Sequence, residues 1–90
     1  MAQEAKDLFK KKPVWSLAVT TATERIGEEQ AYSLVARYVE LSQLIKAKQQ
    51  GGKHPTQEYT VRAEVSRSLQ KANVGKDLLK MLALEARALM

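Results

Sequence analysis

The hydrophobic and polar positions along the chain repeat with helical spacing over most of its length. The clearest pattern covers residues 28–50, where apolar residues recur every three or four positions at Ala31, Leu34, Tyr38, Leu41 and Ile45. Glutamates open this segment, lysines close it and two glycines follow, which matches the dipole and the usual end of a helix. The pattern predicts a helix over 28–50 with one buried face.

Two further segments have the same spacing. After a short connection, Thr56 can cap a helix over 56–73, whose apolar face is thinner and which ends near Asn73 and Gly75. The last helix, over 76–89, has only four strongly polar residues: Asp77, Lys80, Glu85 and Arg87. These four occupy a sector of roughly 160°, so more than half of the circumference is apolar. We expect such a helix to be buried on two sides.

The segment from Val14 to Thr23 is ambiguous, because its apolar residues fit both the alternation of a strand and the spacing of a helix. A single strand would have no second strand to pair with, and Pro13 suits the first turn of a helix. We therefore favour a helix. An alternative is that Thr21 and Glu24 form a capping box, which would leave Gly27 inside one long helix.

These elements predict an all-α protein, a small helical bundle of three main helices plus an N-terminal helical segment. The 90 residues form one domain over 14–90, preceded by a basic N-terminal arm over 1–13. Short connections imply that neighbouring helices run antiparallel. No stretch is apolar enough to cross a membrane or to serve as a signal peptide, and we expect a cytoplasmic protein, or one of the virion or host cytoplasm if phage-encoded.

The composition argues against catalysis. The chain has no cysteine and one histidine, so thiolate chemistry is excluded and zinc is close to excluded. His54 lies beside glycines and a proline in an expected surface turn, without a nucleophile that it could activate. Gly51, Gly52 and Lys53 lack the spacing of a phosphate-binding loop. We expect no enzyme activity, no metal, no cofactor and no small-molecule substrate.

An excess of basic residues favours an anionic partner. Fifteen lysines and arginines against ten acidic residues give a net charge of +5. A helix-turn-helix around Gly27 would place two glutamates against phosphate, and one around Gly75 would present an apolar helix to the bases. Nucleic-acid binding without that motif remains the alternative function, through the basic residues Lys10, Lys11, Lys12, Arg62, Arg67 and Lys71.

The excess apolar surface of the last helix supports a different function. It predicts a small adaptor, regulatory or assembly protein, such as one of a phage or mobile element, that contacts a protein partner or a second copy of itself. Trp15 follows a basic run and a proline, so it either closes the core or anchors an interface. The predicted interface residues are Trp15, Leu79, Met81, Leu84 and Leu89.

Overall fold

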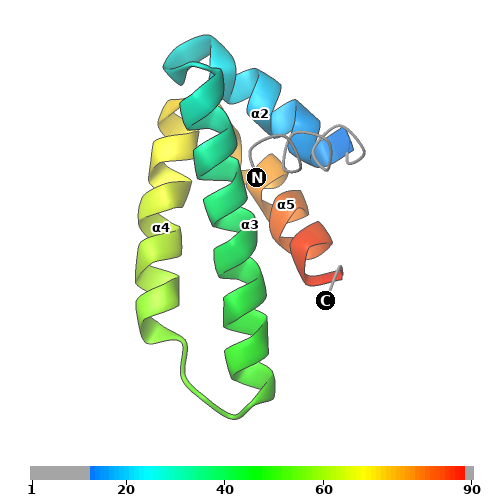
Figure 1. Cartoon of the computed structure of the whole chain (residues 1–90), viewed down its shortest axis with the longest axis vertical. Helices are drawn as coiled ribbons and strands as arrows, with labels where there is room; N and C mark the ends of the chain where they lie inside the picture. Colours follow the sequence, from blue (N-terminus) through cyan, green and yellow to red (C-terminus); the bar gives the residue numbers. More distant parts are fainter. Residues whose placement is uncertain (1–12, 89–90) are drawn as a thin grey trace.

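The computed structural model describes residues 13–88, which form four helices and contain no strand (Figure 1). With the labels of Figure 1, these are α2 (Pro13–Ile26), α3 (Glu28–Gln50), α4 (Thr56–Lys71) and α5 (Lys76–Ala88). The predicted all-α fold and its three main helices are confirmed. Most of the predicted basic arm lies outside the described residues, as does Leu89.

The segment from Val14 to Thr23, which the sequence left ambiguous between strand and helix, lies within helix α2. Its buried residues are those with helical spacing: Trp15, Ala18, Val19 and Ala22. The predicted capping box is wrong, because Thr21 lies in the middle of this helix. Burying one face against a core outweighs the strand propensity of its threonines.

The chain turns sharply at Gly27, so α2 and α3 are separate helices, and the alternative of one long helix is also wrong. Gly27 has a φ of 87° and a ψ of 158°, a conformation that is nearly confined to glycine. Its N–H donates to the carbonyl of Thr23 and its carbonyl accepts from the N–H of Ala31, each at 3.0 Å. One residue therefore ends α2 and begins α3, and α2 crosses the end of the bundle in Figure 1.

Helix α3 is the central element, since α2, α4 and α5 all pack against it. Its buried side chains are Ala31, Val35, Tyr38, Val39, Leu41, Ser42 and Ile45. Leu69 of α4 and Leu82 of α5 are completely buried in the same core. Helix α3 therefore lies at the centre of the core.

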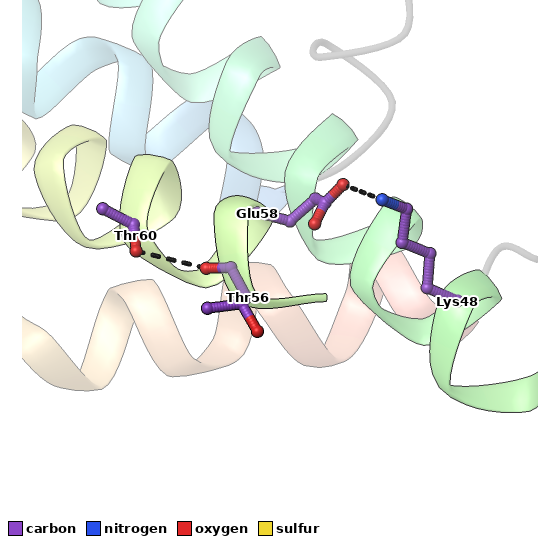
Figure 2. A network of polar contacts seen from close by, with 4 residues as sticks. All are labelled: Lys48, Thr56, Glu58 and Thr60. Atoms are coloured by element: carbon purple, nitrogen blue, oxygen red, sulfur yellow. Dashed lines mark hydrogen bonds and ion pairs between the residues drawn. The ribbon is translucent and has the colours of Figure 1, made fainter. Parts of the chain in front are cut away.

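A glycine turn connects α3 to α4, and an ion pair joins the two helices beside it. Gly52 has a φ of 74°, and the N–H of Lys53 donates to the carbonyl of Lys48 at 2.8 Å, which satisfies a free carbonyl at the end of α3. Lys48 then forms an ion pair with Glu58 in the first turns of α4 (Figure 2). The side chain of Thr56 was expected to cap α4, but it makes no cap, and Pro55 precedes the helix instead.

The next connection uses a non-glycine residue in the left-handed conformation. Asn73 has a φ of 76°, and the N–H of Val74 donates to the carbonyl of Leu69 at 2.9 Å. Val74 and Leu69 are both buried, which is the hydrophobic contact that accompanies this type of helix end. The connection therefore turns the chain back toward α3 while its apolar side chains remain in the core.

Side chains of α3 form hydrogen bonds with the C-terminal end of α5. The carboxamide of Gln43 donates to the carbonyl of Ala86, and the amine of Lys46 donates to the carbonyl of Arg87, both at 3.0 Å. These carbonyls have no partner within a helix that ends at Ala88. The contacts fix the C-terminal half of α5 against α3.

Replacing Gly27 should test the turn between α2 and α3. We expect Gly27→Ala to lower the free energy of unfolding by about 1–3 kcal/mol, because the left-handed φ strains any side chain. No atom would lie within 4 Å of the added Cβ, so the cost would come from the backbone alone. Gly51→Ala is the control, since Gly51 has an ordinary φ and its Cβ would meet only normal contacts. Urea unfolding measures both, and equal losses would contradict this explanation.

The ion pair at the hairpin should make stability depend on pH. The hydrogen bond from Lys48 holds the pKa of Glu58 below its ordinary value of 4.5, and the backbone N–H of Glu58 acts in the same direction. A lowered pKa stabilises the fold above the unfolded pKa, and this contribution is lost as the pH falls through the folded pKa. The stability difference between wild type and Glu58→Gln should therefore shrink from about pH 6 to about pH 3.

Glu64→Gln provides the control for this prediction, because Glu64 is an exposed carboxylate of the same helix. This change removes the same charge from α4 and leaves the ion pair of Lys48 and Glu58 in place. Thermal unfolding at each pH gives both differences. A Glu58→Gln difference that stays constant across the range would show that the ion pair does not stabilise the fold.

Candidate functional site

Helices α4 and α5 lie on different sides of α3 and leave a groove between them. They are joined by the short connection 72–75 and diverge from it (Figure 1). The groove has a volume of about 360 Å³ and a floor formed by Tyr38, Ile45 and Gln49 of α3. Tyr38 and Ile45 are buried, so the floor offers little apolar surface to a ligand.

The α4 side of the groove is organised around Arg62. Its guanidinium lies 5.8 Å from the ring centre of Tyr38 and 5.3 Å from that of Tyr59. It also donates to the hydroxyl of Ser42 at 3.4 Å, and the carboxamide of Gln49 donates to the Tyr59 hydroxyl at 2.7 Å. Arg62 and Tyr59 are therefore held in place before any ligand arrives.

The α5 side contributes three more cations, Lys76, Lys80 and Arg87. Arg87 donates from Nε to the carbonyl of Ala83 at 3.3 Å, which keeps the base of its side chain along the helix. Of the described residues that line the groove, none is a carboxylate. Four positive side chains from two helices thus share one recess without an acidic side chain among them.

The electrostatics at Tyr38 confirm that cations of both helices converge on the floor. Burial raises the pKa of the Tyr38 hydroxyl above its ordinary value of 10.0. The charges of Arg62 and Arg87 act against this rise, because each favours the phenolate. One arginine belongs to α4 and the other to α5, so the two sides of the groove influence the same group.

A second candidate site is the outer face of α5, which we define by Met81 and Leu84. Met81 is 49% exposed and Leu84 is 59% exposed. At 100° per residue both point away from the side chains that α5 buries, which are Leu79, Leu82, Ala83 and Ala86. The other exposed large apolar residues of the described chain, Leu17, Leu44 and Tyr59, lie one on each of the other helices.

The predicted interface residues separate into two groups. Trp15 is 2% exposed and Leu79 is 3% exposed, so both belong to the core and have almost no surface for a partner. Met81 and Leu84 remain exposed, and Leu89 lies outside the described residues. Helix α5 packs against both α3 and α2, while its outer face with Met81 and Leu84 stays exposed. The sequence placed Leu79 with Met81 and Leu84 because apolar residues occur around more than half of the circumference of α5 and also between its charged residues.

The predicted basic surface is divided in the same way. Arg62 faces the groove, Arg67 is exposed but does not line it, and Lys71 lines a separate depression beside Ile26 and Leu34. The lysines Lys10, Lys11 and Lys12 lie outside the described residues. Sequence reasoning missed Lys76, Lys80 and Arg87 as a set. Their spacing of four and seven residues places them on one side of a helix, which was a usable signal.

The remaining chemistry is sparse. Within residues 13–88 no three histidine, aspartate or glutamate side chains gather in a way that could hold a metal ion. His54 is exposed in the connection between α3 and α4. No helix in this range is long and apolar enough to cross a membrane.

Comparison with protein-family models, with curated proteins and with solved structures finds no match to this chain.

Proposed function

We propose that this protein acts without catalysis, by protein–protein contact, and that it self-associates along the outer face of α5. The observation that carries the proposal is the exposure of Met81 and Leu84, one turn apart on a helix whose opposite face is already in the core. Exposed apolar side chains grouped on one face of a helix are typical of contact surfaces.

The charges beside this face favour a second copy of the chain as the partner. Lys80 precedes Met81 and Glu85 follows Leu84, so at 100° per residue they flank the apolar pair on opposite sides. In a two-stranded parallel pair, the four residues take the positions g, a, d and e of a heptad. Lys80 of one copy then approaches Glu85 of the other. Because the two copies are related by two-fold symmetry, this attractive contact forms twice.

An antiparallel pair would be unfavourable for the same residues. In that arrangement each flank meets the same flank of the other copy, so Lys80 faces Lys80 and Glu85 faces Glu85. Within the described chain, neither residue forms an ion pair that would neutralise it, and Oε2 of the half-buried Glu85 is itself buried and accepts no hydrogen bond. The charge pattern therefore supports a parallel pair of α5 helices.

The contact should be weak. The apolar part of the face covers about one heptad, well below the area of a standard stable interface. We expect a dissociation constant on the order of tens of micromolar or weaker. Association would thus depend on local concentration, as in an assembly or regulatory protein.

Nucleic-acid binding through the predicted set of basic residues has less support, because Arg62, Arg67 and Lys71 do not share a surface. The groove between α4 and α5 is a different arrangement of cations, to which Arg62 belongs and Arg67 and Lys71 do not.

Charge exchange across α5 should test the self-association. Sedimentation velocity from about 10 μM to about 1 mM should show a monomer–dimer equilibrium for wild type. We expect Lys80→Glu and Glu85→Lys each to weaken it, because each single change replaces attraction with repulsion. The double variant should restore association, since the two pairs reappear with their charges exchanged.

Leu84→Gln should also weaken the dimer, whereas Leu44→Gln is the matched control, because Leu44 is an exposed leucine on the outer side of α3. Circular dichroism verifies that each variant keeps its helix content. Wild type that remains monomeric throughout the range would contradict the proposal, and so would a Leu44→Gln effect as large as that of Leu84→Gln.

A further inference from the structure

The groove between α4 and α5 concentrates positive charge in a recess that shares one residue, Lys80, with the proposed dimer contact. Arg62 projects from α4, and Lys76, Lys80 and Arg87 project from α5. Among residues 13–88, no carboxylate lines the groove to compensate for them. Like charges held close together repel one another, so an anionic ligand would relieve an electrostatic cost as well as form contacts.

We propose that this groove binds single-stranded nucleic acid, with the four cations on its phosphates and the ring of Tyr59 against a base. Along α5 the cations span eleven residues from Lys76 to Arg87, which corresponds to roughly 16 Å of helix. Tyr59 is 43% exposed at the edge of the groove, and its hydroxyl is held by Gln49. A positive channel with an aromatic platform is the general arrangement for binding single strands.

The shape of the site favours a single strand over a duplex. A duplex is commonly bound by an element that protrudes into one of its grooves, such as a recognition helix. Here the cations line a recess between two helices, over a floor provided by α3. A flexible single chain can enter such a recess with its phosphates turned toward the cations.

The surface of the groove also favours nucleic acid over an acidic protein segment. Protein contacts depend on several apolar and aromatic anchors that become buried in the interface. The aliphatic side chains of the groove, Ile45, Leu79 and Ala83, are already buried in the core, and among the described residues that line it Tyr59 is the exposed aromatic one. The groove presents mainly hydrogen-bond donors: guanidinium, ammonium and carboxamide groups. Phosphate binding requires these donors and no apolar surface.

A matched pair of double variants separates the groove from the overall charge. Lys76→Gln with Arg87→Gln removes one lysine and one arginine from the groove, whereas Arg67→Gln with Lys71→Gln removes one of each from outside it. The probe is a fluorescent single-stranded DNA of about 12 nucleotides, followed by anisotropy at low salt. We expect the groove pair to lose about tenfold or more in affinity, and the outside pair about twofold or less.

The salt dependence gives a second measurement. Four phosphate contacts predict a slope of log affinity against log salt of about −3 for wild type, and the groove pair should reduce its steepness by about 1.4. Equal losses in the two double variants, or no binding by wild type at low salt, would overturn the proposal. Neither variant changes Lys80 or Glu85, so both keep the charges that are proposed to pair in the dimer.

Two further probes identify the source of the negative charge. Tyr59→Leu should weaken binding of the DNA by about tenfold but leave binding of inorganic polyphosphate unchanged, because only the DNA has bases to stack. Equal effects on both probes would assign the groove to phosphate alone and contradict the role of Tyr59. A poly-glutamate peptide that competes as well as DNA of equal charge would overturn nucleic acid as the ligand in favour of an acidic protein segment.

Discussion

The structure depends on covering the wide apolar face of α3. At 100° per residue the buried side chains of α3, from Leu41 on one flank to Val39 on the other, span roughly 160° of its circumference. One neighbouring helix cannot cover such an arc, because helices pack along narrow ridges and grooves. Three helices therefore cover this face of α3. Helices α4 and α5 pack beside α3, and α2 packs across one end (Figure 1).

This arrangement creates the groove. Helices α4 and α5 pack mainly on α3 and little on each other, and polar side chains occupy the space between them. Arg62 contributes to both structure and charge, since its guanidinium lies over two tyrosine rings while it faces the groove. A cation held by aromatic rings and by the hydroxyl of Ser42 is already positioned for an anion, which lowers the cost of ordering it on binding.

Helix α5 connects the two candidate sites. Its buried side joins the core, one flank lines the groove with Lys76, Lys80 and Arg87, and its outer face presents Met81 and Leu84. Lys80 borders both the groove and the outer face. Pairing of Lys80 with Glu85 of a second copy would withdraw this cation from the groove, so the two proposals compete for the same side chain.

The sequence by itself determined the helices, because their periodicity, glycine stops and terminal charges are local properties of the chain. It also indicated that α5 has more apolar surface than one core can cover. The tertiary structure alone decided which apolar residues of α5 are buried. Leu79 and Met81 lie on different sides of α5, and the core covers only the side of Leu79. It likewise brought Arg62 together with cations of α5 and separated it from Arg67 and Lys71. Charge on a helix is local, whereas the sharing of a groove depends on how two helices are placed on a third.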